Sequence, residues 1–275
     1  MLIIVAGATV MVLFYGESIW NKLSAGASEP PFFSWGENDD DVNATKEEFK
    51  SWRKKGNNGL SLTVINAMSP EWNEFFNQAI SDWNAAPALN LKTEMASQPD
   101  PDCKHIPGKL KACNDFYGMS GWSGLNEAWL TDNYIITAST AKMNESYLKG
   151  KPFTEKQYVT CHELGHGFGL PHRDTNPNNI DLGTCLDYTT NYGKNMHPDE
   201  VDFENLAKLY GPSSRRLDED DDDFEDLDPM AKPATMSRNR SYKDGRLLFK
   251  SDTKEIYEEI LSDGGRIIST LLLAK

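Results

Sequence analysis

The alternation of apolar and polar residues predicts a series of short strands in the middle of the chain. Residues 60–67 (LSLTVINA) alternate in this way, as expected of a strand with one buried face. Further strand-like runs lie at 89–93, 109–114, 125–130 and 134–143. Helical patterns separate or follow these runs, so the chain is expected to be an α+β protein.

Three segments have helical periodicity. The first has one broad apolar face, made of Trp72, Phe75, Phe76, Ala79, Ile80 and Trp83. Ser69 is expected to cap it, and Pro70 suits its first turn. A second helix is predicted over Thr154–Gly169 with Thr154 as its cap, and Pro198 opens a third that ends before Gly211.

The N-terminal segment is expected to direct the chain into the secretory pathway. An apolar run covers Leu2–Tyr15, which is shorter than the roughly 20 residues of a membrane-spanning helix. A small-residue pattern at Ala25–Ala27 follows it, so residues 1–27 are interpreted as a signal peptide or an uncleaved signal-anchor. A buried core segment is the alternative. Residues 28–57 are rich in charge, Pro and Gly and suit a linker or short pro-segment.

The composition changes after the third helix. Asp218–Asp228 contains nine acids and no base, so residues 213–244 are predicted to be an acidic, disordered linker. A pair of arginines at Arg215–Arg216 precedes the acidic stretch and is a candidate dibasic processing site. Residues 245–275 regain strand-like runs, with a turn at Asp263–Gly265, and are predicted to form a small β appendage.

The net charge of the chain argues against some classes of function. The 275 residues carry a formal net charge of -14, from 28 basic and 42 acidic side chains. Such a chain has no basic excess to neutralise phosphates, which argues against binding to nucleic acids or to anionic membranes. Pro212–Met230 contributes nine acids against two arginines, or half of the net charge. A membrane is therefore expected as a partner only if the N-terminal run is an uncleaved anchor.

One window carries the chemistry. Residues 161–172 have the sequence CHELGHGFGLPH. His162 and His166 lie four residues apart, so on a helix they project from nearly the same face and can hold zinc. Glu163 lies about 100° further round the helix, beside a metal and not on it, where a general base belongs.

The glycines of this window predict how a third ligand arrives. Gly165 and Gly167 suggest tight packing against another backbone, because each costs stability in a helix interior. Gly169 suggests a left-handed turn that ends the helix, and the returning chain brings His172 to the metal. Three protein ligands leave the fourth position of zinc for water, which is typical of a catalytic site.

This extended His-Glu-x-x-His-x-x-Gly-x-x-His pattern resembles the signature of the metzincin metallopeptidases. The resemblance implies zinc on His162, His166 and His172, with Glu163 as the general base. It also implies a catalytic domain over 58–212, with a twisted, five-stranded mixed sheet over an active-site helix and a C-terminal helix. Substrates of such enzymes lie along the edge strand of the sheet, and Trp122–Trp129 is the candidate for that strand.

The resemblance extends to a turn after the third histidine. Thr184–Tyr188 matches the Met-turn of the family, with Leu186 where methionine is expected. Leucine has a volume similar to that of methionine and can still form the apolar base of the metal site. Tyr188 matches a tyrosine that ligates zinc or donates a hydrogen bond to the oxyanion in some metzincins. A packed aromatic ring is the alternative role for Tyr188.

The four cysteines fit the same resemblance. It implies a Cys161–Cys185 bridge that joins the turn to the active-site helix, and a Cys103–Cys113 bridge that closes the preceding insertion. A catalytic dyad of Cys161 and His162 is the rival interpretation. Adjacent residues of a helix diverge by about 100°, which argues against the dyad.

The sequence therefore predicts a secreted, monomeric zinc endopeptidase that acts on proteins or peptides. The alternative is a non-catalytic zinc-binding or interaction module with the same fold, motivated by Leu186. Calcium binding by the acidic tract 218–228 has no support, because a like-charge run offers no fixed cage. A thiol blocker of zinc is not available from Ser28–Leu60, which holds no cysteine, and an acidic blocker at Asp39–Asp41 is less favoured than a solvated charge run.

Overall fold

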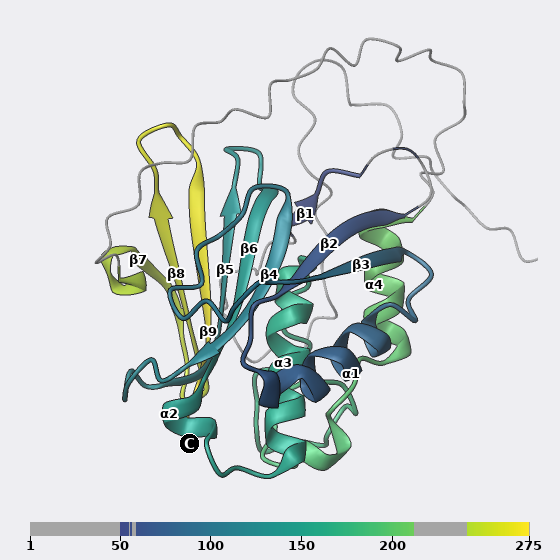
Figure 1. The fold of residues 1–275 in the computed structure, drawn as a ribbon, viewed down its shortest axis with the longest axis vertical. Helices are drawn as coiled ribbons and strands as arrows, with labels where there is room; N and C mark the ends of the chain where they lie inside the picture. Colours follow the sequence, from purple (N-terminus) through teal and green to yellow (C-terminus); the bar gives the residue numbers. More distant parts are fainter. Residues whose placement is uncertain (1–49, 55, 57–58, 212–240, 275) are drawn as a thin grey trace, which may run out of the picture. The chain divides into compact units, whose positions relative to one another are not determined.

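The described strands of this computed structural model form one mixed sheet (Figure 1). The chain divides into two units, Met1–Phe33 and Ser34–Lys275. Residues 50–54, 56, 59–211 and 241–274 are described, and all of them belong to the second unit. Four segments singled out from the sequence lie outside these residues: the predicted signal segment, Asp39–Asp41, the Arg215–Arg216 pair and the acidic tract.

One half of the sheet is parallel. Its strands are β2 (Leu60–Asn66), β3 (Leu89–Met95), β4 (Lys109–Asp115) and β6 (Ile135–Asn144), in the order β3-β2-β4-β6. These strands match four of the runs predicted from the sequence. A short strand, β1 (Ser51–Trp52), pairs in parallel with β6, although it lies within the segment predicted to be a linker.

The other half of the sheet is antiparallel. β5 (Trp122–Leu130) pairs with β6 on one side and with β9 (Arg266–Leu273) on the other. β8 (Lys254–Ile260) and β7 (Arg246–Lys250) complete the order β5-β9-β8-β7. The predicted C-terminal appendage thus continues the central sheet.

The prediction that Trp122–Trp129 is an exposed edge strand is wrong. β9 pairs with β5 from Trp122↔Leu273 to Leu130↔Arg266. The prediction failed because the acidic stretch before residue 245 suggested a separate appendage, and composition does not reveal which strand a later segment joins.

The helices lie mainly against one face of the sheet (Figure 1). A 3₁₀ turn, η1 (Pro70–Trp72), leads into α1 (Asn73–Trp83), and α3 (Phe153–Gly167) packs against α1, β5 and β6. The predicted apolar face of α1 is buried, and the indole of Trp83 donates a hydrogen bond to Cys161 O at 3.0 Å. Shorter elements are α2 (Glu145–Leu148), η2 (Tyr192–Lys194) and η3 (Tyr242–Asp244), and α4 (Glu200–Tyr210) is the third predicted helix.

Of the two predicted helix caps, one is confirmed in position and the other is wrong. Ser69 is the N-cap residue of η1, but its side chain makes no capping hydrogen bond, and its hydroxyl accepts from Asn114 Nδ2 at 3.1 Å. Thr154 lies inside the first turn of α3, which begins at Phe153 after Pro152. The α+β class is confirmed, and no helix in the described part of the chain is long and apolar enough to cross a membrane.

Candidate metal centre

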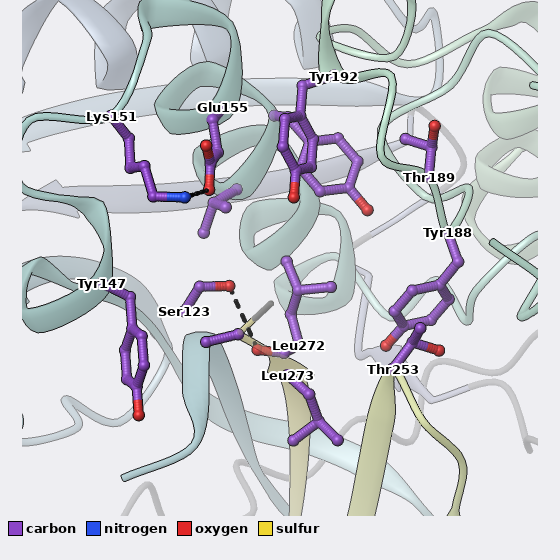
Figure 2. A pocket seen from close by; sticks show the side chains of 13 residues that line it. Ser123, Tyr147, Lys151, Glu155, Tyr188, Thr189, Tyr192, Thr253, Leu272 and Leu273 are labelled. Carbon is purple, nitrogen blue, oxygen red and sulfur yellow. Dashed lines mark hydrogen bonds and ion pairs between the residues drawn. The ribbon is translucent and has the colours of Figure 1, made fainter. Parts of the chain in front are cut away.

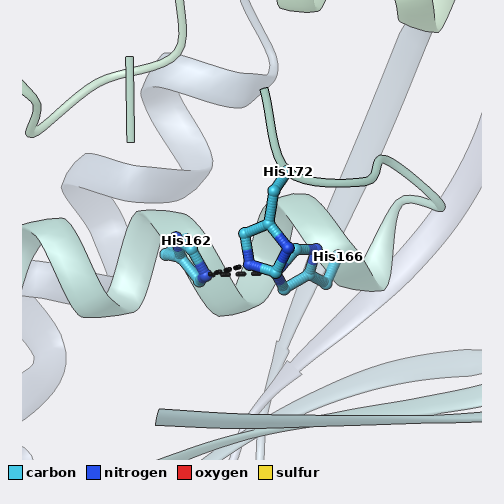
Figure 3. Close-up of side chains that lie close together, drawn as sticks. All are labelled: His162, His166 and His172. Carbon is cyan, nitrogen blue, oxygen red and sulfur yellow. Dashed lines mark hydrogen bonds between the residues drawn. The ribbon is translucent and has the colours of Figure 1, made fainter. Parts of the chain in front are cut away.

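Helix α3 supplies the first two histidines of the site. His162 and His166 lie one turn apart near its C-terminal end, and both are buried. Figure 3 shows their rings projecting from the same side of the helix, towards His172. Two glycines let neighbours approach this helix: a Cβ at Gly165 would lie 2.8 Å from the ring of Trp83, and one at Gly167 would lie 2.6 Å from Leu110. The predicted tight packing is therefore present, but against side chains.

The third histidine follows a reversal of the chain at Gly169. This glycine has φ +96°, and a Cβ on it would lie 2.1 Å from Lys50 O. Only glycine suits that combination of left-handed backbone and close approach. Gly169 N donates to His166 O at 2.9 Å and closes the last turn of the helix. The chain then carries His172 back over the helix, as the sequence predicted.

The three Nε2 atoms converge. They lie 3.1 Å apart between His162 and His166, and 3.0 Å apart from each of these to His172. No other group of three or more His, Cys, Asp or Glu with this geometry occurs among the described residues. The centre of such a triangle lies about 1.8 Å from each corner, so one zinc ion with bonds of about 2.0–2.1 Å reaches all three.

The hydrogen bonds of the rings determine which nitrogens carry hydrogen. His162 Nδ1 lies 2.7 Å from Cys185 O, and His166 Nδ1 lies 2.8 Å from Leu170 O. A carbonyl oxygen only accepts, so both Nδ1 atoms donate, and in neutral rings both Nε2 atoms hold lone pairs. Two lone pairs that face each other at 3.1 Å repel, and a shared cation removes that repulsion. The residues therefore fit a zinc ion.

Glu163 lies against β5 beside this cluster. Its side chain is fully buried, and neither carboxylate oxygen has a hydrogen-bond partner among the described residues. Burial raises the pKa of Glu163 well above its ordinary value. A Cβ at Gly124 of β5 would lie 2.1 Å from Glu163 Oε1, so the carboxylate occupies space that only a glycine leaves. A buried carboxylate without a hydrogen-bond partner is costly, and a catalytic role or a bound ion or water is a usual reason for one.

The turn that follows the third histidine also lies at the cluster. The ring centroid of Tyr188 is 4.7 Å from that of His172 and 5.9 Å from that of His162. Leu186 is fully buried, and its Cδ2 would lie 2.9 Å from a Cβ at Gly165, so the leucine packs against α3 below the ligands. A disulfide joins Cys161 of α3 to Cys185 of the turn.

The second disulfide lies in a different part of the molecule. Cys103 and Cys113 are bonded and pack in a small apolar cluster with Ile65 and Ala67, which is separate from the main core. There are no free cysteines in the described part of the chain, and all four cysteines lie within it. The rival dyad of Cys161 with His162 is excluded in this structure because the Cys161 sulfur is in a disulfide.

Sequence reasoning missed the ion pairs that hold the third ligand's segment. Arg173 Nη1 lies 2.8 Å from Asp199 Oδ1 and 3.0 Å from Asp202 Oδ1, at the start of α4. Asp202 also accepts a hydrogen bond from the Thr184 hydroxyl, and Arg173 N donates to Leu186 O at 2.9 Å. The Asp-x-x-Asp spacing of the α4 capping box was the available signal in the sequence.

Sequence reasoning also missed a lysine of the C-terminal strands. Lys254 of β8 is 2% exposed, and its Nζ lies 3.2 Å from His172 Nδ1. Beside the cluster, Thr253 and Leu272 line a pocket together with Tyr188 and Tyr158 (Figure 2). Nothing in the spacing of the sequence predicts that residues about 80 positions after His172 reach this site.

Comparison with known proteins finds only distant structural similarity. No family model and no curated protein matches the chain. High choriolytic enzyme 1, a hatching-enzyme zinc protease from the medaka fish Oryzias latipes, is 12% identical, with a TM-score of 0.33 over 58% of this chain and 94% of that one. Myroilysin is 13% identical, with a TM-score of 0.35 over 62% of this chain and 94% of that one.

Similarity at these TM-scores carries no weight for the chemistry of the site. The resemblance to the metzincins lies in the order of the motif and in its geometry. Its three histidines, separated by four and six residues, converge on one point.

Proposed function

We propose that this protein is a zinc-dependent endopeptidase whose ligands are His162, His166 and His172. The observation that carries the proposal is the convergence of three Nε2 atoms, 3.0–3.1 Å apart, beside the buried carboxylate of Glu163, which has no hydrogen-bond partner in the described part of the chain. This combination suits hydrolysis, in which a metal ion and a base act on the same water.

The protein's own groups have separate roles in the proposed reaction. Zinc, when bound, lowers the pKa of a coordinated water towards about 7 and polarises the peptide carbonyl. Cys185 O and Leu170 O hold His162 and His166 in the tautomer that presents Nε2. Glu163 accepts the proton of the attacking water and delivers it to the leaving amine, and Tyr188 donates a hydrogen bond to the carbonyl oxygen.

The disulfides support the proposed compartment. Disulfides form and persist in oxidising environments, and this chain contains two. Secretion, directed by residues 1–27, accounts for them and for the proposed action on protein or peptide substrates outside the cell.

Glu163→Gln tests the assigned base. The amide has nearly the same shape but cannot accept a proton, so zinc content is expected to stay near one per chain while peptide cleavage falls at least about 100-fold. Metal analysis and cleavage of a broad peptide library measure the two quantities. Glu204→Gln, on the exposed face of α4, is the matched control and is expected to change neither. Undiminished cleavage by the zinc-loaded Glu163→Gln variant would contradict the role.

A further inference from the structure

The outer edge of β5 lies beside the proposed catalytic groups. Gly124 of β5 contacts the carboxylate of Glu163, and Asn126 Nδ2 donates to Glu163 O at 3.1 Å. The inner edge of β5 pairs with β6. Its outer edge therefore carries the backbone groups to which an extended peptide can pair while it passes the metal centre.

β9 already pairs with that edge. At the level of the metal centre, Gly124 pairs with Leu272, and Leu272 pairs with Lys254 of β8. Directly paired residues point to the same side of a sheet. Since a Cβ at Gly124 would point at Glu163, the side chains of Leu272 and Lys254 also face the metal centre. Both are buried, and Lys254 Nζ lies 3.2 Å from His172 Nδ1.

Residues of the C-terminal segment also line the neighbouring pocket. Leu272 and Leu273 of β9 lie across it from Tyr192, and Thr253, just before β8, lies beside Tyr188 (Figure 2). Ser123 Oγ of β5 contributes a further hydrogen bond, to Leu272 O at 3.4 Å. The C-terminal strand thus makes backbone contacts with β5 and side-chain contacts with the pocket.

From these contacts we infer that residues 241–274 are an autoinhibitory segment, with β9 bound as an extended strand where a peptide substrate must pair. The inference rests on the proposed peptidase function. It accounts for a metal centre whose first two histidines and general base are buried, although a protease must admit a peptide chain to them. In the intact chain the edge of β5 is unavailable, and the enzyme is latent until this segment leaves.

Tethering makes the segment an effective competitor. A strand joined to its own binding site has an effective concentration of the order of millimolar. A free peptide of equal intrinsic affinity, present at about 1 μM, is then outcompeted roughly 1,000-fold. Cutting the connection removes this advantage but leaves the strand paired, so release also requires weaker pairing.

The test uses the full chain with two changes. A recognition sequence for a highly specific protease replaces residues 219–225, which lie between the catalytic elements and the C-terminal strands. Leu272→Asp is added to weaken the docking of β9, because it introduces a carboxylate at a side chain that is 6% exposed and faces the helices. Leu247→Asp, on the outermost strand β7 and 46% exposed, is the matched control.

Release of the segment is expected to activate the enzyme. After cleavage, the Leu272→Asp chain should lose its C-terminal fragment on size-exclusion chromatography and keep its zinc. Its cleavage of the peptide library should rise at least tenfold over the uncut chain, and β5 amides should exchange hydrogen faster. The cut Leu247→Asp chain should retain the fragment and stay latent.

Other outcomes overturn the inference. If the fragment leaves and neither peptide cleavage nor peptide binding rises, the segment does not block the site. If the remainder unfolds on release, as judged by circular dichroism, the segment is a structural part of the domain, and the inference is wrong.

A binding measurement separates this inference from the proposed function. In the Glu163→Gln background, the affinity for a fluorescent library peptide, measured by anisotropy, is expected to rise at least tenfold on release. Equal peptide affinity before and after release would contradict autoinhibition and leave the proposed peptidase function standing. A released chain with Glu163 present that binds zinc and peptide but cleaves nothing would contradict the peptidase function and support a non-catalytic module.

Discussion

The two halves of the sheet are built in different ways, and the metal centre lies where they meet. In the parallel half, α1 connects β2 to β3, so the strands and the helix that covers them are neighbours in sequence. In the antiparallel half, β7, β8 and β9 form a meander that reaches β5 from the far end of the chain. β5 is the boundary strand, because it pairs with both.

This difference separates the proposed catalytic groups from the residues that cover them. The first half and its helices provide the three histidines and Glu163. The second half contributes Lys254, which contacts His172, and Leu272, which lines the pocket beside Tyr188, and neither residue belongs to the motif. If β9 leaves β5 as inferred above, the metal centre is expected to open while its three histidines stay in place.

The largest effect is expected from a change at the boundary strand itself. In Gly124→Ala, the new Cβ would lie 2.1 Å from Glu163 Oε1 and 2.8 Å from its Cδ, so the buried carboxylate must move. A misplacement of about 1 Å in a catalytic group costs roughly 100-fold in rate. Cleavage by the released chain is therefore expected to fall about 100-fold, with zinc retained.

Gly193→Ala is the matched control for this prediction. The nearest atom to its new Cβ is Thr154 Cγ2 at 3.8 Å, an ordinary contact, so activity is expected to stay within about twofold. Zinc analysis and kcat/KM on one peptide measure both variants. If Gly124→Ala cleaves as fast as the parent, the contact between β5 and Glu163 is not part of the working geometry.

The sequence was sufficient to predict the strands and the helix of the parallel half, but not the strand pairing of the antiparallel half. Alternation in 60–67 and the apolar face of α1 follow from local periodicity, and both are found in the structure. β9 was predicted as a strand, but its partner was not. Pairing between β5 and a strand more than 130 residues later depends on which edge is free after the rest has folded, and local periodicity does not carry that information.

The same division holds for the site. The ligands and Glu163 occupy one short window, where helical spacing and the turn at Gly169 fix their relative positions. Lys254 contacts His172 from a strand that is distant in sequence, so no spacing indicates it, and for Arg173 the only signal was the Asp-x-x-Asp spacing of its partners in α4. Motifs reveal groups that are close in the chain, and only the fold reveals what approaches them from elsewhere.

An effect of intermediate size is expected from removing either of the two disulfides. Cys161–Cys185 spans 24 residues, and Cys103–Cys113 spans 10. Loop-closure entropy predicts that replacing either pair by serine lowers the free energy of unfolding by about 3 kcal/mol. Only the first bridge touches the ligands, because Cys185 O accepts the hydrogen bond of His162. Its removal is therefore expected to weaken zinc binding by about tenfold or more.

Urea unfolding and competitive zinc titration measure these two effects. The Cys103→Ser/Cys113→Ser chain serves as the control, with a similar loss of stability and unchanged zinc affinity. Equal zinc affinities for the two double variants would show that the bridge beside the metal centre stabilises the fold without positioning His162.

The smallest effect concerns two buried carboxylates, one in the turn beside the metal centre and one in β8, whose pKa values shift in opposite directions. Burial raises the pKa of Asp187, next to Tyr188, to about 6. At Glu258 of β8, burial also acts to raise the pKa, but hydrogen bonds from Arg246 and Arg266 outweigh it and hold the pKa below its ordinary value. Protonation therefore favours the fold at the first carboxyl and opposes it at the second.

The free energy of unfolding of the parent protein is expected to fall as the pH rises from about 4 to about 6. In Asp187→Asn this fall should be absent. A raised carboxyl pKa stabilises the fold below the unfolded-state pKa and loses that contribution as the pH passes the folded-state value. We expect a change on the order of 1 kcal/mol, since solvent screens part of the penalty. Urea unfolding across this pH range measures the change.

Glu258→Gln tests the opposite pH dependence. The free energy of unfolding of the parent is expected to fall as the pH drops below about 4.5, and this fall should be absent in the variant. If both variants change the pH profile in the same direction, the electrostatic contrast between the turn beside the metal centre and β8 is wrong.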